Sequence, residues 1–510
     1  MSGLVAEAGI HALVLFAPLA FGGVEGWALG VIQIIAGIVA AAWAVGRLSG
    51  PRPGPRPPGG VWIPVLLFAA LAGVTMVPLP SAWIAALSPG VHAFYETAVP
   101  GYAQGRPFQA AELVPWLLSD QAERLPPAQG DTSPLLDPPL ASSGLPLSVP
   151  ARRTLSIYPF ATRQQLLLLL CYLAVFGAAC DRFDRRERLL RLARVGVFAA
   201  ALVSLIGILM KATGTRKFFW VREASSLNIF GPFVDRNTYA AFAGFWLAVA
   251  LCMVLFVLGR RGRPVRPGSL AFWGGAAVLM IAGIFLSLSR GGILTAALVT
   301  ILAAVFGLAR GGPKGAPLGL GAMLAAALLL VVWIGPERVL ERIGTLSAGS
   351  RVPSLQHRVE AWSRTGGLIQ DHLLLGTGLG TFRFAFMRYA PPGEGWWTTA
   401  HNEPLELLCD TGLAGGALFL WGLVAFLRRA ARPGRLGQGE DGYLWAGLAL
   451  GVAGLVLHSC VTSNLQIPAN ALTLALGGAG LWNTSQMLSA RPSRSARPRP
   501  VPEPGEAAAS

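Results

Sequence analysis

Long apolar stretches dominate this chain and decide what it can fold into. Runs of about 17 to 25 mostly apolar residues are long enough for a helix to cross the hydrocarbon core of a bilayer. Such runs begin near residues 9, 27, 61, 164, 195, 237, 269, 291, 317, 404, 443 and 470. Of the 510 residues, 53% are hydrophobic and only 13% are charged, which excludes an ordinary soluble enzyme. We predict an all-α integral membrane protein with about 12 transmembrane helices.

The basic residues indicate how these helices are oriented. Lysine and arginine outnumber the acidic residues 41 to 25. Since positive charge is retained in the cytoplasm, the connections that carry it should lie there. This distribution predicts a multi-pass membrane protein with both termini cytoplasmic, and it favours anionic ligands over nucleic acid. The basic connections are 47–56, 182–194, 260–266, 310–314, 428–435 and 490–499, whereas the hairpins at 22–26 and 461–468 carry no lysine or arginine.

This orientation divides the chain into six segments. Residues 353–372 have apolar side chains at helical spacing, which predicts an amphipathic helix in a small helical periplasmic cap before the tenth span. The proline-rich stretch 104–150 lacks a helical period, so it is an ordered coil, a flexible cover or a tolerated insertion. The predicted segments are transmembrane helices 1–3 (1–79), a long periplasmic segment (80–163), helices 4–9 (164–334), the cap (335–403), helices 10–12 (404–489) and a disordered cytoplasmic tail (490–510).

Cationic side chains gather in the predicted outer segments. Arg290 lies between two apolar spans beside a serine and two glycines, where it could bind an anion or extend to the lipid headgroups. Arg358 lies on the predicted cap helix and could direct its guanidinium at a phosphate or simply face solvent. Arg236 adds charge on the same side, with Arg216, Lys217 and Arg222 nearby in the sequence. Together these cations indicate a polyanionic ligand.

His401 is the candidate base. It directly precedes a predicted helix whose first residues are Asn402, as the N-cap, and Pro404 in the first turn. The positive end of that helix favours a neutral imidazole that can accept a proton, although a structural hydrogen bond is the commoner role of a single histidine. Glu406 and Asp410 share one face of the helix. They could orient His401 or pair with the arginines, or Glu406 could lie at the water boundary.

The sequence offers no pattern of metal ligands. Its outer segments contain no acidic pair or histidine and cysteine set with metal-like spacing, and the five cysteines lie in or at the ends of apolar runs. We therefore expect neither a metal nor another cofactor.

Several motifs resemble, in the same order, segments of the O-antigen ligase and polymerase superfamily of bacterial membrane proteins. The block 358–412 is the most specific of them. The resemblance implies that Arg290 and Arg358 hold a lipid diphosphate and that His401 is the catalytic base. Asp235 and Thr462 depart from the asparagine and aspartate common in the family. The motifs are FAPLAFGGVEGW, FGPFVDRNTYAAF, SLSRGG, HRVEAWSRTGGLIQDHLLLGTGLGTF, HNEPLELLCDTGLAGG and HSCVTSNLQIPANAL.

In line with this resemblance, we expect a protein of the bacterial inner membrane that carries out an inverting, metal-independent transfer of glycan from an undecaprenyl-diphosphate donor to lipid A core on the periplasmic face. A polymerase that extends a second lipid-linked glycan, of O-antigen or exopolysaccharide, remains open, as does transfer to protein. From another class, a transporter of polyprenyl-linked glycan would usually show repeated halves, which this sequence lacks. Polysaccharide-assembly proteins are possible partners, besides the lipid bilayer. The expected roles are catalysis by His401, diphosphate binding by Arg290, Arg358 and Arg236, and support by Asn402, Glu403, Trp362 and Asn237.

Overall fold

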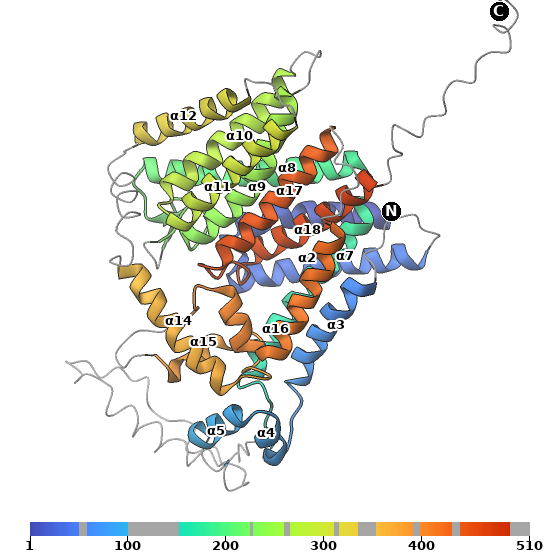
Figure 1. The fold of residues 1–510 in the computed structure, drawn as a ribbon, viewed down its shortest axis with the longest axis vertical. Coiled ribbons are helices and arrows are strands. Elements are labelled where there is room, and N and C mark those ends of the chain that lie inside the picture. The colour runs from blue at the N-terminus through green and yellow to red at the C-terminus, as the bar shows by residue number, and fades with distance from the viewer. Residues whose placement is uncertain are drawn as a thin grey trace, which may run out of the picture. The chain divides into compact units, whose positions relative to one another are not determined.

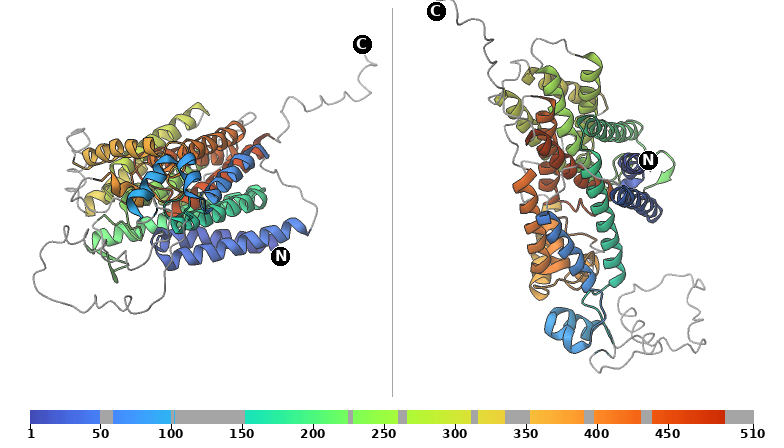
Figure 2. Two further views of the ribbon diagram at one scale, coloured as in Figure 1. Left: turned by 90° about the horizontal axis from the view of Figure 1, so that it is seen from below. Right: turned by 90° about the vertical axis from the view of Figure 1, so that its right-hand side faces the viewer.

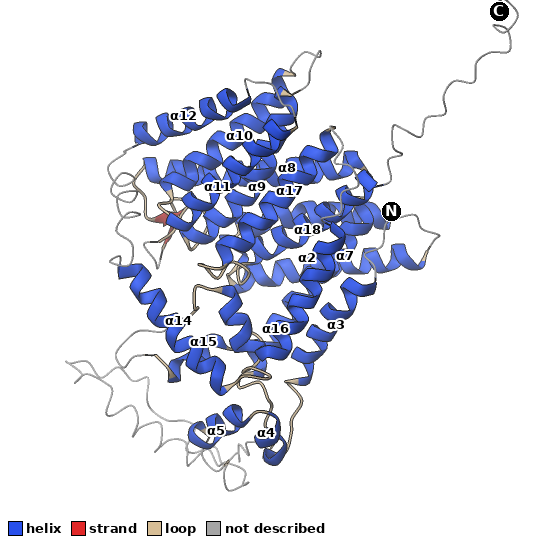
Figure 3. Cartoon of the chain, viewed as in Figure 1, coloured by secondary structure: helices blue, strands red, loops and turns tan. Residues whose placement is uncertain are grey.

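The described part of the chain is almost entirely helical. The computed structural model describes residues 1–49, 59–99, 102, 152–224, 228–259, 266–310, 316–334, 353–390, 398–430 and 439–489. Within these ranges the strands β1 (Lys217–Phe218) and β2 (Arg222–Glu223) form one antiparallel hairpin, and helices make up most of the remainder (Figure 3). This agrees with the predicted all-α class.

Nine helices in the described residues are long and apolar enough to cross a membrane. The chain is therefore a multi-pass membrane protein. Three further helices fall on predicted spans: α3 (Gly59–Val74) and α12 (Ala316–Ile334) have shorter apolar parts, and the polar side chains of α18 (Pro468–Ser489) lower its hydropathy. The total of 12 spans stays a prediction. The nine helices are α1 (Ser2–Leu19), α2 (Gly26–Leu48), α7 (Pro159–Arg182), α8 (Arg186–Ala212), α9 (Arg236–Leu258), α10 (Pro267–Leu286), α11 (Arg290–Ala309), α16 (Glu403–Ala430) and α17 (Glu440–Ser459).

The chain forms two compact units, and the division between them falls within α7 and α16. We call the first the bundle unit; it consists of Met1–Pro58, Cys171–Ser347 and Val424–Ser510. We call the second the cap unit; it consists of Gly59–Leu170 and Ala348–Leu423.

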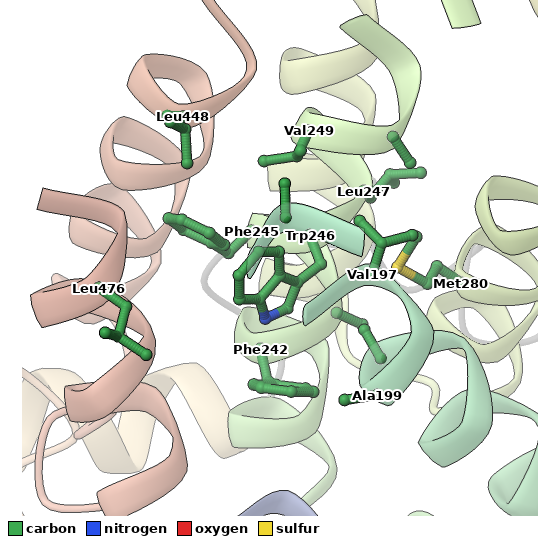
Figure 4. Packing of buried hydrophobic residues seen from close by; sticks show 14 of the residues in the cluster. Val197, Ala199, Phe242, Phe245, Trp246, Leu247, Val249, Met280, Leu448 and Leu476 are labelled. Atoms are coloured by element: carbon green, nitrogen blue, oxygen red, sulfur yellow. The ribbon is translucent and has the colours of Figure 1, made fainter. Parts of the chain in front are cut away.

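Helix α9 is the centre of the bundle unit. It packs against α8, α10, α11 and α17 (Figure 1). Its sequence is apolar on every side, as expected of a helix surrounded by others. Glycines on neighbouring helices make room for its large rings: Gly196 of α8 lies against Trp246, and Gly477 of α18 lies against Phe245. Figure 4 shows these two rings among aliphatic side chains of α8, α10, α17 and α18.

Ion pairs join the helices at one end of the bundle unit. Glu7 of α1 is buried and pairs with Arg182 and Arg191 at 2.7 and 2.8 Å. Asp181 pairs with Arg47 at 2.7 Å, which joins α7 to α2. Helices α1 and α2 run side by side (Figure 2). Two carboxylates therefore pair with three of the arginines that we placed in the cytoplasm.

The start of α8 corrects one prediction. We expected the fourth connection to extend through 182–194, with the next span from about 195, but α8 begins at Arg186. Arginine is a good helix former, so the basic residues continue the helix instead of interrupting it. Arg186 pairs with Glu440 and Asp441 of α17, which stabilises this first turn. The predicted fourth span also begins earlier than 164, at Pro159.

The connections at the opposite end of the bundle unit contact one another. The 3-10 turn η1 (Phe21–Gly23) joins α1 to α2, and its Phe21 ring lies 5.1 Å from the Phe218 ring of the β hairpin. In the same turn Gly22 packs against Phe233 and Ile467. Connections that the charge pattern assigned to one side thus lie together within this unit. Which side of a membrane they face stays a prediction.

The cap unit combines the described parts of the two long segments that we predicted to lie outside. It contains α4 (Ser81–Leu87), α5 (Pro89–Ala98), α14 (Pro353–Asp371), α15 (Phe382–Ala385) and the 3-10 turn η3 (Phe386–Arg388). Helix α14 agrees with the helix predicted for 353–372. Leu79 and Arg153 pair as an antiparallel bridge, and the Ile157 amide donates to Thr377 at 2.9 Å. Both ends of the segment 80–163 are therefore fixed to the cap unit, whereas 104–150, 335–352 and the tail 490–510 lie outside the described residues.

Candidate functional site

Two helices of the bundle unit begin with the predicted arginines. Arg236 is the first residue of α9 and Arg290 the first of α11. Asp235 caps α9 by accepting a hydrogen bond from the Asn237 amide at 2.6 Å, and Ser289 caps α11 by accepting from Gly292 at 3.2 Å. The Ser289 hydroxyl also donates to Asn237 Oδ1 at 2.8 Å. This bond holds the two helix starts together.

The charges at these helix starts favour an anion. Arg290 and Arg236 interact unfavourably as like charges, while Asp235 offsets part of the positive charge on Arg236. The positive ends of two helix dipoles add to the same potential. Backbone amides and arginine side chains at a helix start are well suited to phosphate oxygens. The structure thus brings Arg290, Arg236 and Asn237 together, as one cationic site of the bundle unit.

Buried polar side chains surround this cationic site. A Cβ atom on Gly291 would lie 2.9 Å from His458 Nε2, so the glycine permits the imidazole of α17 to approach the start of α11. Asn464 donates to Ser459 at 3.2 Å, and Asn470 donates to the Thr238 carbonyl at 3.1 Å. The end of α17 and the start of α18 therefore supply a polar lining to the helix starts that carry the arginines.

His401 lies in the cap unit, in a strained backbone conformation. Its φ angle is +51°, which is unusual for a residue with a side chain. Asn402 follows as the predicted N-cap: its Oδ1 accepts a hydrogen bond from the Leu405 amide at 3.1 Å. Thr399 Oγ1 lies 3.5 Å from His401 Nδ1, at the limit of a hydrogen bond. The imidazole thus stands directly before the positive end of α16.

The peptide before His401 is fixed on both sides. Ala400 is fully buried; its carbonyl accepts a hydrogen bond from Trp362 Nε1 at 2.8 Å, and its amide donates to Glu406 Oε1 at 2.6 Å. Trp362 belongs to α14 and Glu406 to α16, so two helices together determine where His401 lies. We call this arrangement the Ala400 clamp. Of the roles considered for Glu406, the structure shows orientation of the histidine backbone, and Glu406 is buried instead of lying at a water boundary.

Helix α16 is interrupted at Gly412, where hydrogen bonds are exchanged with a loop. Gly412 has φ +62° and ψ −167°, so the amides of residues 413 and 414 cannot bond to the helix carbonyls of 409 and 410. They donate instead to the carbonyls of Leu373 and Leu374 at 2.8 and 3.1 Å. The freed carbonyls accept in return from the amides of residues 377 and 378 at 3.0 and 2.8 Å. The loop after α14 is thereby joined to α16.

Asp410 binds the next part of that loop. Its carboxylate is buried and accepts hydrogen bonds from the amides of Gly380, Thr381 and Phe382 at 2.6, 3.1 and 2.9 Å. Three glycines of the loop, at 376, 378 and 380, have positive φ, which explains the spacing GTGLG in this motif. Among the described residues Asp410 bonds to backbone amides and pairs with no arginine, so it organises the loop and does not serve the arginine pairing considered from the sequence.

The remaining predicted residues also lie in the cap unit. Arg358 is half-buried on α14, one turn before Trp362, and Glu403 is the half-buried first residue of α16. The predicted site residues therefore form two groups, one in each unit. Arg236, Asn237 and Arg290 belong to the bundle unit, and Arg358, Trp362, His401, Asn402 and Glu403 belong to the cap unit.

Two residues in these groups escaped the sequence reasoning. Ser289 joins α9 to α11, and a serine directly before a helix start is a recognisable capping pattern. His372 is buried at the end of α14, where a Cβ on Gly90 would lie 2.8 Å from its Nδ1. Burial lowers the pKa of His372 below its usual value of 6.5, although Asp371 opposes this shift. Nothing in the local sequence pattern distinguishes this histidine from an exposed one.

Within the described residues, no group of three or more His, Cys, Asp or Glu could hold a metal ion. Residues 275–420 match the family model for O-antigen ligase. The matched range begins in α10 and ends in α16, and it contains Arg290, Arg358, Trp362 and His401. The predicted resemblance to the O-antigen ligase and polymerase superfamily is confirmed over this part of the chain. No curated protein matches the chain.

Proposed function

We propose that this protein is an O-antigen ligase that transfers glycan from an undecaprenyl-diphosphate donor to lipid A core. The observation that carries the proposal is the Ala400 clamp, which fixes His401 at the start of α16 inside the segment similar to O-antigen ligases. A histidine whose backbone is held this firmly, in a left-handed conformation, is suited to a role that needs a defined position.

The donor's diphosphate is the proposed ligand of the arginines. Arg290 and Arg236 begin two helices that are joined through Ser289 and Asn237, so both guanidinium groups stand on fixed backbone. Arg358 on α14 would provide a further charge. When the bond between the sugar and the diphosphate breaks, negative charge develops on the leaving phosphate oxygen, and arginines stabilise that charge. This is why we propose a reaction that does not depend on a metal ion.

His401 is the proposed general base. A neutral imidazole can take the proton from an acceptor hydroxyl as that oxygen attacks the anomeric carbon. Attack opposite to the departing diphosphate gives a single displacement, which inverts the anomeric configuration. Asn402 and Glu403 would position the acceptor, since they directly follow His401 at the helix start. The proposed active site faces the periplasm of the inner membrane, on the side opposite to the basic connections.

The test is glycan transfer by purified protein in proteoliposomes from an undecaprenyl-diphosphate-linked donor. Lipid A core and a second donor molecule are offered as acceptors in parallel reactions. We expect product on lipid A core, and we expect His401→Ala to lower the rate by about a hundredfold or more. Arg290→Ala should raise the KM for the donor more than Arg290→Lys does, because lysine keeps the positive charge. Arg290→Lys should still raise this KM, because lysine lacks the bidentate geometry of the guanidinium group.

Each outcome distinguishes the alternatives. Lengthened lipid-linked chains with no product on lipid A core would make the protein a polymerase that uses the same residues. Full activity of a folded His401→Ala protein would exclude histidine as the base. Transfer to neither acceptor, together with movement of the donor across the membrane, would favour the transporter.

A further inference from the structure

The hairpin between α8 and α9 has an unusual tip. Strands β1 and β2 pair Lys217 with Glu223 and Phe218 with Arg222, so the tip consists of Phe219, Trp220 and Val221. Tips of hairpins exposed to water are normally built from glycine, asparagine and aspartate, which tolerate positive φ. Here all three tip residues are large and apolar, and Phe219 and Trp220 have φ angles of +50° and +63°.

Contacts with other residues of the bundle unit hold the tip of the hairpin in place. Phe218 is buried, with its ring 5.1 Å from Phe21 in the connection between α1 and α2. Trp220 Nε1 donates to Thr213 Oγ1 at 2.8 Å, which fixes the indole to the end of α8. Arg222 lies 5.1 Å over the Phe21 ring and pairs with Glu25 at 3.1 Å. The hairpin is therefore an ordered element of the bundle unit, with one face packed against it.

The side of the tip that is not packed against the bundle unit is apolar and exposed. Val221 is 81% exposed and Trp220 is 43% exposed. Below the tip, α8 presents the exposed apolar side chains Phe198, Leu205 and Leu209 on one face. In a membrane-spanning helix such a face meets lipid. Since Thr213 follows α8 directly, the tip stands at the depth where this lipid-facing surface ends, which is the headgroup level at which tryptophan is typically enriched.

The charges around the tip suit a phospholipid surface. Arg216 is exposed, and Lys217 and Arg222 are also exposed although they pair with Glu223 and Glu25. Three cations therefore face two carboxylates, which leaves the hairpin positively charged. An apolar tip flanked by basic residues is the pattern of an element that inserts into the interface of a bilayer.

We propose that the hairpin 216–223 inserts into the surface of the bilayer, with Trp220 and Val221 at the boundary between headgroups and acyl chains. Arg216 binds phospholipid phosphates. The strained tip is stable because the membrane solvates side chains that water would not. This membrane contact fixes the height of the α8 to α9 connection, which leads directly to Arg236. The inference does not depend on the proposed transferase activity.

The test measures the depth of single residues in proteoliposomes of phosphatidylethanolamine and phosphatidylglycerol. Val221→Cys is introduced together with Cys460→Ser, which removes the exposed native thiol, and is labelled with an environment-sensitive fluorophore. Glu223→Cys, in the same hairpin, is the matched control. The parent Cys460→Ser protein gives the background from the other four thiols, and its melting temperature controls for folding.

We expect a blue-shifted emission at position 221 and several-fold stronger quenching by lipids with a nitroxide near the headgroup than at position 223. Water-like emission at position 221, or equal quenching at both positions, would overturn the proposal. Disulfide formation between two Val221→Cys copies without lipid quenching would overturn it in favour of a contact between copies.

Discussion

Buried and half-buried carboxylates have different partners in the two units. In the bundle unit Glu7 and Asp181 pair with arginines and join the ends of transmembrane helices. In the cap unit Glu406 and Asp410 accept hydrogen bonds from backbone amides and join loops to α16. The same side-chain chemistry thus holds helices together in one unit and shapes loops in the other.

The difference follows from the kind of element that carries the proposed site residues in each unit. The bundle unit offers Arg236 and Arg290 from helix starts, whose positions follow from helix packing and from the capping residues Asp235 and Ser289. The cap unit offers His401 from a loop, whose backbone would be mobile without added bonds. Glu406 and Asp410 supply those bonds by accepting hydrogen bonds from backbone amides. Paired substitutions, one in each unit, test this difference between the units.

The largest effect should come from a glycine of the cap unit. Gly412→Ala would place a Cβ atom 2.4 Å from the backbone of Leu374, in a conformation that side chains disfavour, so we expect a loss of about 4 kcal/mol or more. Gly291→Ala in the bundle unit would place its Cβ atom 2.9 Å from the His458 side chain and away from other backbone, in a helical conformation, and should cost much less. Titration with sodium dodecyl sulfate in mixed micelles measures both; equal losses would contradict the comparison.

Removing a carboxylate should rank second. Asp410→Ala leaves three buried amides without their acceptor, and we expect a loss of about 3 kcal/mol in the free energy of unfolding. Glu7→Ala should cost less, roughly 2 kcal/mol, since water can solvate Arg191, which is 59% exposed, although it reaches Arg182 only in part, at 18% exposed. A larger loss for Glu7→Ala would show that ion pairs matter more here than amide hydrogen bonds. Unfolding in mixed micelles again gives both values.

A tryptophan pair separates positioning from stability. Trp362→Phe loses the hydrogen bond to Ala400, and we expect kcat to fall about tenfold, which corresponds to about 1.4 kcal/mol, with little change in KM. Trp445→Phe loses a similar bond, from the indole to the Ala430 carbonyl at 3.2 Å, in the bundle unit. It should leave transfer unchanged. If both variants lose activity equally, the Ala400 clamp has no special role.

The smallest effect concerns pH. Burial lowers the pKa of His372 below 6.5, so as the pH falls below 6.5 the unfolded chain binds a proton before the folded cap unit does. Stability should therefore decrease as the pH falls through that range and should not change above it. His372→Leu should remove this dependence. Melting temperatures of both proteins across this pH range show whether stability falls with the pH. An unchanged pH dependence in the His372→Leu protein would assign that dependence to other groups.

Sequence reasoning located the spans and the residues of each group for clear physical reasons. Apolar length and the placement of arginine are local properties, so α9, α11 and the starts at Arg236 and Arg290 could be read from the sequence. The cap of α16 at Asn402 was equally local. For α8 the pattern misled, because arginines that resemble a connection pair with acids and extend the helix.

The parts that could not be predicted depend on contacts between distant segments. Trp362 and Glu406 were both noticed, but nothing local shows that they meet at the same peptide of Ala400. Gly412 lies in an apolar run that reads as an unbroken helix, and only the loop 373–378 explains the interruption. The fixing of Arg153 and Ile157 to the cap unit likewise required the fold.

The exchange of hydrogen bonds at Gly412 has a consequence for how the protein is made. A hydrophobic helix that is interrupted inside a bilayer would expose unpaired backbone groups to lipid. The loop that pairs with those groups, 373–378, precedes α16 in the chain and so leaves the ribosome first. The loop 373–378 is therefore already synthesised when α16 emerges. We therefore expect insertion of this span and folding of the cap unit to be coupled, so that an error in the loop would appear as a failure of the helix to enter the membrane.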